Sequence, residues 1–254
     1  MAAGAELFSY LLRLGDDALI LGQRLSELVG RAPEIEEEMA LINISLDLIG
    51  QARLLLSYAG EVEGAGRDED DLAYLRDVLD FRNHLLVELP NGDFAHTICR
   101  LFLVSAFKEQ QYEALARSRD ERLAAIAAKA LKEVRYHVRH SGAWMVRLGD
   151  GTEESHARAQ RALDALWMYT GELFTPDALD RAMAEAGVGP DVAALKPGWD
   201  ERVNAVLREA TLRRPEDGWM QSGGKDGRMH TEHLGHILAE MQFLRRAYPD
   251  ATAW

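Results

Sequence analysis

The sequence predicts an all-α protein, a long four-helix bundle with additional C-terminal helices, and three observations support this prediction. The 254 residues are rich in Ala, Leu, Glu and Arg, which favour helices. Only seven are proline, and no alternating polar and apolar pattern predicts a strand. Apolar residues recur at alternating spacings of four and three, the period of a helix packed on a core. The clearest run is Leu7, Leu11, Leu14, Ala18, Leu21, Leu25 and Leu28.

Helix breakers divide the chain into segments. Gly30 ends the first segment, and Pro33, a favourable first-turn residue, opens the second. The second segment is apolar nearly all round, which predicts a helix buried on several sides. We expect one domain, 1–254, with core helices at about 6–29, 33–59, 94–117 and 120–148 and a C-terminal helical extension at 152–254.

The connection between the second and third core helices is long and contains a further helical segment at about 70–88. A bundle with short up-down loops has no such crossover, whereas a ferritin-like bundle requires one. The predicted fold is therefore a ferritin-like four-helix bundle.

Composition and charge argue against several functions. The net charge of -13 repels phosphate groups and acidic lipids, so we expect no nucleic-acid partner. The most apolar stretch, 39–56, is interrupted by Asp47 and Arg53, so we expect no membrane span. One cysteine, Cys99, and a first stretch without basic residues predict a cytoplasmic protein.

A ferritin-like bundle can hold two iron ions between one Glu from each of two helices and a Glu-x-x-His from each of the other two. In the second core helix Asp47 is followed three residues later by Gly50, which offers no ligand. In the last core helix Glu133 is followed by His137 at the fourth position instead of the third. Lys108 stands where a third carboxylate could have been. The ligand pattern is therefore incomplete.

A buried lysine would repel ferrous iron and would need a carboxylate partner, for which Asp47 and Glu133 are the obvious candidates. We therefore expect an ion-pair network of Asp47, Lys108, Glu133 and His137 in a vestigial metal-site region, and no catalytic, cofactor-binding or metal-binding residue. The alternative, in which Asp47 and Glu133 point to solvent or to a partner, stays open.

Three other groups attract attention. Glu153 to His156 reads as Glu-x-x-His, but its place after a glycine loop favours a helix start, where acidic residues are stabilising. The cluster His230, Glu232, His233 and His236 could gather at another helix start, and whether it binds a metal stays open. The loop 223–227 lacks the Gly-Lys-Ser/Thr end of a phosphate loop, and we interpret it as a mobile or docking loop.

Several blocks, in this order, resemble the C subunits (PaaC) of bacterial ring-1,2-phenylacetyl-CoA epoxidases. The match spans nearly the whole chain and is weak only at 190–199. The blocks are Arg13-Leu-Gly-Asp-Asp17, Gln23-Arg24-Leu25, Asp47-Leu-Ile-Gly-Gln-Ala-Arg53, Glu88-Leu-Pro-Asn-Gly-Asp-Phe94, Lys132-Glu-Val-Arg-Tyr-His137, Arg147-Leu-Gly-Asp-Gly151, Gly223-Gly-Lys225, His230-Thr-Glu-His-Leu-Gly235 and Leu238-Ala-Glu-Met-Gln242.

This resemblance implies a structural, non-catalytic subunit of a monooxygenase complex in phenylacetate catabolism. The resemblance further implies a PaaA-like catalytic partner that holds the di-iron centre and binds phenylacetyl-CoA. It also implies a small bridging subunit and a reductase whose FAD and iron-sulfur cluster deliver electrons from NADPH. Two alternatives stay open. One is a di-iron oxygenase in its own right, with Asp47, Glu133 and His137 as altered ligands and His140 as a further candidate; the other is an iron-storage or structural bundle unrelated to oxygenation.

Overall fold

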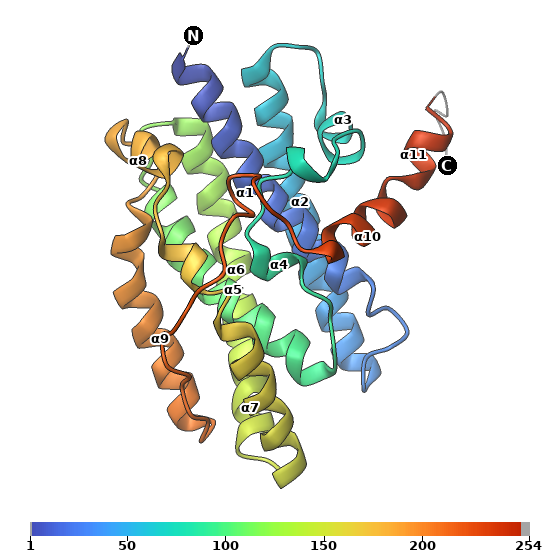
Figure 1. Cartoon of the computed structure of the whole chain (residues 1–254), viewed down its shortest axis with the longest axis vertical. Helices are drawn as coiled ribbons and strands as arrows, with labels where there is room; N and C mark the ends of the chain where they lie inside the picture. The colour runs from blue at the N-terminus through green and yellow to red at the C-terminus, as the bar shows by residue number, and fades with distance from the viewer. Residues whose placement is uncertain (1, 250–254) are drawn as a thin grey trace.

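The computed structural model describes residues 2–249 and confirms the all-α prediction, since this range contains helices and no strand. Its four long helices form a bundle (Figure 1) and lie within a few residues of the predicted bounds. They are α1 (Ala2–Ser26), α2 (Ile35–Glu63), α5 (Phe94–Leu115) and α6 (Glu121–Gly149).

The helix ends follow from local signals in the sequence. Gly64 ends α2 in the left-handed conformation, with φ at 69°. The side chain of Asp93 caps α5, and that of Asp120 caps α6. Thr152 caps α7 (Glu153–Trp167), whose first turn holds Glu153 and Glu154. The Glu-x-x-His stretch is therefore the start of a helix, as expected.

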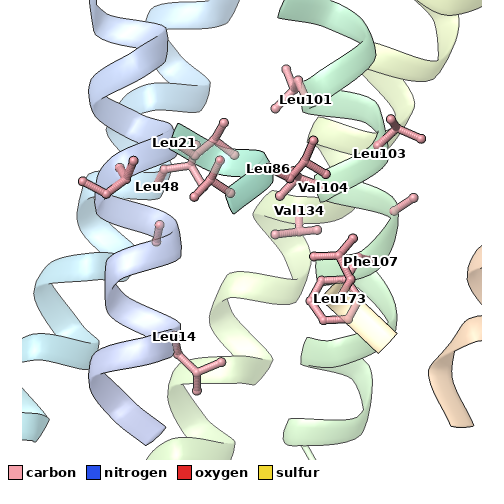
Figure 2. Packing of buried hydrophobic residues seen from close by; sticks show 14 of the residues in the cluster. Leu14, Leu21, Leu48, Leu86, Leu101, Leu103, Val104, Phe107, Val134 and Leu173 are labelled. Carbon is pink, nitrogen blue, oxygen red and sulfur yellow. The ribbon is translucent and has the colours of Figure 1, made fainter. Parts of the chain in front are cut away.

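The core lies between two helix pairs, α1 with α2 and α5 with α6 (Figure 1). Figure 2 shows Leu14 and Leu21 of α1 on one side of this core and Phe107 of α5 on the other. The first pair packs closely because α1 carries glycine at the contact. A Cβ added to Gly15 would lie 2.9 Å from a methyl carbon of Leu56.

The crossover from α2 to α5 differs from the single helical segment predicted at 70–88. It consists of α3 (Glu69–Tyr74), a 3-10 turn η1 (Val78–Asp80) and α4 (Leu85–Glu88). Backbone N–H groups of Arg82 and His84 donate to Asp16 and Asp17 of α1, each at 2.8 Å. Those N–H groups are consequently not available to a continuous helix, so tertiary contacts override the local helix propensity here.

The C-terminal extension covers one side of the bundle and then returns across it (Figure 1). Trp199 is buried and donates to the carbonyl oxygen of Leu103 at 3.0 Å, which anchors the stretch around it to α5. After α7 its elements are η2 (Gly171–Phe174), α8 (Ala178–Glu185), η3 (Val192–Leu195), α9 (Lys196–Glu209), α10 (Glu232–Met241) and α11 (Phe243–Ala247).

The second core helix is not buried on several sides, contrary to the prediction. One face of α2, including Ile44, Leu48 and Leu55, lies in the core, whereas Met39 and Leu46 on the opposite face are exposed. Within residues 2–249, α2 packs mainly against α1, α3 and α6, and none of these covers that opposite face. By length and composition alone α2 could also cross a membrane, a test that the core helix of a soluble protein passes as well.

Candidate functional site

A buried ion pair crosses the bundle between α1 and α5. Lys108 on α5 donates through Nζ to Asp17 Oδ2 at 2.7 Å and to Gln111 Oε1 at 2.9 Å. Asp17 also accepts from His84, through the backbone N–H and the ring Nδ1, each at 2.8 Å. We call these four residues the central network. Every member is buried, so the network joins α1, the crossover and α5 away from solvent.

The charge of Asp17 is stabilised within the central network. Burial by itself would raise the pKa of Asp17, but the charges and hydrogen bonds of His84 and Lys108 outweigh it and hold that pKa well below its usual range. Asp17 therefore stays ionised near neutral pH. Its carboxylate already accepts three hydrogen bonds within the chain, from His84 twice and Lys108 once. It is therefore poorly suited to bind a metal ion.

A second group of polar residues lies between α2 and α6, and we call it the α2–α6 seam. His137 Nε2 lies 3.1 Å from Asp47 Oδ2, with the His137 side chain buried and that of Asp47 36% exposed. Gln51 donates to Glu133 Oε2 at 2.9 Å and accepts from the Tyr112 hydroxyl at 3.2 Å. These contacts are hydrogen bonds at the edge of the core.

The same seam continues toward both ends of α2. Near its start, Trp144 Nε1 donates to Glu37 Oε2 at 2.6 Å, and His140 Nε2 lies 3.3 Å from the same oxygen. Near its end, the Tyr58 hydroxyl donates to Asp120 Oδ2 at 2.7 Å. The two helices are thus joined along their length by polar pairs.

The four residues predicted to form one network belong to two. Asp47, Glu133 and His137 lie in the α2–α6 seam, whereas Lys108 lies in the central network with Asp17 as its carboxylate partner. The prediction that Asp47 or Glu133 pairs with Lys108 is wrong, because both turn toward the seam. A signal for Asp17 was present in the sequence, since it stands next to Ala18 within the apolar run of the first helix.

The inference from Gly50 also needs correction. No heavy atom lies within 4 Å of a Cβ built on Gly50, so this position opens away from the bundle interior. A missing imidazole there carries no information about an interior metal site. Its neighbour Gln51 is buried instead and, with Ser45, is an inward polar residue of α2 that was not predicted from the sequence. Between residues 2 and 249, no three His, Cys, Asp or Glu side chains are grouped so that they could hold a metal ion.

The charged residues at the start of the Arg13-to-Asp17 block have a clear structural role. Arg13 Nη1 donates to Asp180 Oδ1 of α8 at 2.6 Å. Asp16 accepts from Arg76 Nη1 of the crossover at 3.0 Å. Both pairs are buried, so this block of α1 holds the crossover and the C-terminal extension against the bundle.

The histidines of the 230–236 cluster do not gather. His230 turns inward, and its Nδ1 lies 2.8 Å from Glu88 Oε2. Burial alone would lower the pKa of His230, but the hydrogen bond and charge of Glu88 outweigh it and raise that pKa. His236 and Glu232 are exposed. The cluster is therefore divided between an internal ion pair and the surface.

The glycine loop 223–227 is anchored, so its interpretation as a mobile or docking loop is wrong. Backbone N–H groups of Gly223, Gly224 and Lys225 donate to Glu172 Oε1 at 2.8, 2.8 and 3.2 Å. The other oxygen of Glu172 accepts from the N–H of Leu85 at 2.8 Å. Successive amides in a turn form an anion site, and here a carboxylate of the same chain fills it.

Two comparisons with known proteins agree with each other. The sequence model of the family described as "Phenylacetic acid catabolic protein" matches residues 2–254, so the chain belongs to that family. The chain is also 51% identical over 244 residues to the C subunit of 1,2-phenylacetyl-CoA epoxidase from Escherichia coli (strain K12). That match covers 96% of this chain and 98% of the relative.

Proposed function

We propose that this member of the phenylacetic acid catabolic protein family is the non-catalytic structural subunit of a cytoplasmic phenylacetyl-CoA epoxidase. In this proposal it pairs with and stabilises a PaaA-like subunit that holds the di-iron centre. A small bridging subunit and a reductase with FAD, an iron-sulfur cluster and NADPH complete the complex. The 51% identical relative, itself named as one subunit of an epoxidase and matched over 98% of its length, supports this proposal.

The ion pair of Lys108 and Asp17 is the observation that carries the non-catalytic role. A di-iron site gathers carboxylates and imidazoles inside the bundle and leaves coordination positions open. Here the inward cation of Lys108 stands 2.7 Å from the carboxylate of Asp17 and would repel a ferrous ion. The donors present therefore do not fit a di-iron centre, and we derive no oxygen chemistry from this chain.

The other predicted ligands agree with this argument. Asp47 and His137 face one another, but Glu133 is engaged by Gln51 and does not complete a ligand set with them. His140 lies about two turns further along α6 than Glu133 and contacts Glu37 instead. A di-iron oxygenase with these altered ligands would need several side chains to leave their present partners at once.

Co-expression with the PaaA-like subunit of the same epoxidase tests the proposal. After the pair is purified and its chains are separated, iron is counted on each. NADPH- and O₂-dependent loss of phenylacetyl-CoA is assayed, with the reductase and bridging subunit added, for each chain and for the pair. We expect the iron to stay with the PaaA-like subunit. We expect turnover by the pair and none by either chain without the other. Stoichiometric iron on this chain together with turnover in the absence of the PaaA-like subunit would favour the di-iron alternative.

A further inference from the structure

A groove between α6 and α9 is lined by more basic than acidic side chains. It has a volume of about 610 Å³ and lies where α9 packs against α6. Four arginines and two glutamates line it, an excess of two positive charges, whereas the net charge of the whole chain is -13. We call it the arginine groove; its basic residues are Arg135, Arg139 and Arg147 of α6 and Arg202 of α9.

Three of these arginines have no partner of opposite charge. Within residues 2–249, no carboxylate lies at ion-pair distance from Arg135, Arg139 or Arg147, although Arg122 of the same helix pairs with Glu61. Arg135 and Arg139 are four residues apart, on one face of α6, where like charges destabilise a helix. The described chain does not offset this repulsion, which points to an anion from outside.

Neighbouring aromatic rings hold two of the guanidinium groups in place. The Cζ atom of Arg139 lies 5.4 Å from the ring centre of Tyr136, and that of Arg147 lies 5.1 Å from the ring centre of Trp144. Stacking of this kind uses the face of the guanidinium and leaves its N–H edge free to donate. A fixed guanidinium edge matches two oxygens of a phosphate group at once. These arginines are therefore arranged to bind phosphate.

The two acidic residues do not cancel this positive charge. Glu109 is buried, and its Oε2 lies 3.2 Å from Nη2 of Arg202, so the charge of Glu109 is offset by that arginine. Glu209 is exposed, and water screens its charge. The negative charges elsewhere on the chain act weakly here, because salt screens exposed charges beyond about 10 Å.

The walls of the groove are apolar between the charged groups. Val138, Val146 and Val206 line it, and Gly142 and Ala143 leave the part of α6 between Arg139 and Arg147 without long side chains. A concave site of about 300–1,000 Å³ with apolar walls and a few placed charges is typical of small-molecule binding. The groove therefore has the size and lining of a site for a small anion with apolar parts.

We propose that the arginine groove binds a small molecule that carries two or more phosphate groups. Coenzyme A thioesters belong to this class, and so do free nucleotides and pyrophosphate. The apolar walls favour the coenzyme, whose adenine and pantetheine parts are less polar than its phosphates. The choice of the coenzyme rests on the proposed function, in which phenylacetyl-CoA is the substrate of the complex. The phosphate site itself rests on the arginines alone.

Isothermal titration calorimetry of the full-length chain, purified on its own, tests the proposal. The probes are coenzyme A, inorganic pyrophosphate, and pantetheine, which has no phosphate. In Arg139→Gln, and separately in Arg135→Gln, the affinity for coenzyme A should fall at least about tenfold, because a charged hydrogen-bond donor is lost. Arg161→Gln is the matched control, since Arg161 of α7 is exposed and does not line the groove. We expect wild-type affinity in the control and wild-type circular dichroism in every variant.

The three probes identify the source of the phosphate groups. Coenzyme A bound more tightly than pyrophosphate, with no binding of pantetheine, supports the site and identifies the coenzyme as its ligand. Pyrophosphate bound at least as tightly as coenzyme A supports the site and identifies a free phosphate compound. Pantetheine bound as tightly as coenzyme A would overturn the proposal, because recognition would then not involve phosphate.

Other outcomes would also overturn the proposal. These are no binding of either phosphate probe by the wild-type chain, wild-type affinity in both groove variants, and equal weakening by Arg161→Gln. Absence of phosphate binding together with weaker binding of Arg139→Gln to the PaaA-like subunit would assign the groove to an acidic partner surface instead. Failure of the co-expression test would reject the proposed pairing and leave the phosphate site standing, since calorimetry uses this chain alone.

Discussion

The central network and the α2–α6 seam use similar side chains in different surroundings. In the central network, Asp17, His84 and Lys108 are all buried and each finds its partners inside the chain. In the seam, Asp47 remains 36% exposed beside the buried His137. When one partner of a buried pair is removed, the charge of the other is left uncompensated. In an exposed pair, water can take the place of the missing partner. Burial, more than residue type, should therefore decide how much each pair contributes to the free energy of unfolding.

The largest effect is expected for Lys108→Met. This change leaves the carboxylate of Asp17 buried without its ammonium partner, which should cost about 3–5 kcal/mol of unfolding free energy. Urea denaturation followed by circular dichroism measures it. Adding Asp17→Asn to this variant should restore part of the loss, because the unpaired charge disappears with it. A loss for Lys108→Met as small as that for a surface lysine would contradict the comparison.

The pH dependence of the central network sharpens the same contrast. The pKa of Asp17 is lower in the folded chain than in the unfolded chain, where it is about 3.9. Its contribution to stability is therefore present above that unfolded value and is lost as pH falls through the folded one. Urea denaturation of wild type and Asp17→Asn from pH 7 downward should show a stability difference that shrinks in acid. A difference independent of pH would refute this assignment of the charge.

The pair of His230 and Glu88 is also buried, and its contribution to stability changes with pH in the opposite direction. Its pKa is raised in the folded chain by Glu88, so its contribution is fully present below the unfolded value of about 6.5 and is lost as pH rises through the folded one. Glu88→Gln should lower the pKa of His230, as measured by NMR titration of the ring. An unchanged pKa of His230 in Glu88→Gln would contradict this assignment.

The smallest effect is expected for Asp47→Asn in the seam. The amide keeps a hydrogen bond to His137, and water reaches the position, so the loss should stay below about 1 kcal/mol. The same urea measurement applies. A loss as large as that for Lys108→Met would show that the seam, despite its exposure, is as sensitive as the central network.

Candidate sites were predicted unevenly from the sequence. The helix start at Glu153 was predicted correctly, because a capping residue lies within a few residues of the backbone N–H group that it caps. The interior cation Lys108 was recognised as well, since it interrupts an apolar stripe. Its partner was misassigned, because Asp17 stands 91 positions away and nothing local indicates which carboxylate it meets. For the same reason Glu172 was missed, and the glycine loop 223–227 that it anchors was misinterpreted as mobile or docking.

The class of fold and the positions of the long helices follow from the amino-acid sequence alone. Hydrophobic period, capping residues and breakers act over one or two turns, so they can be recognised without knowledge of the rest of the chain. How each helix is rotated about its axis, and which helices lie beside it, became clear only from the folded chain. That rotation placed Gly50 outward and Gln51 inward, although they are adjacent, and it set Lys108 against Asp17. Rotation and register arise from packing among distant segments, which a local pattern does not encode.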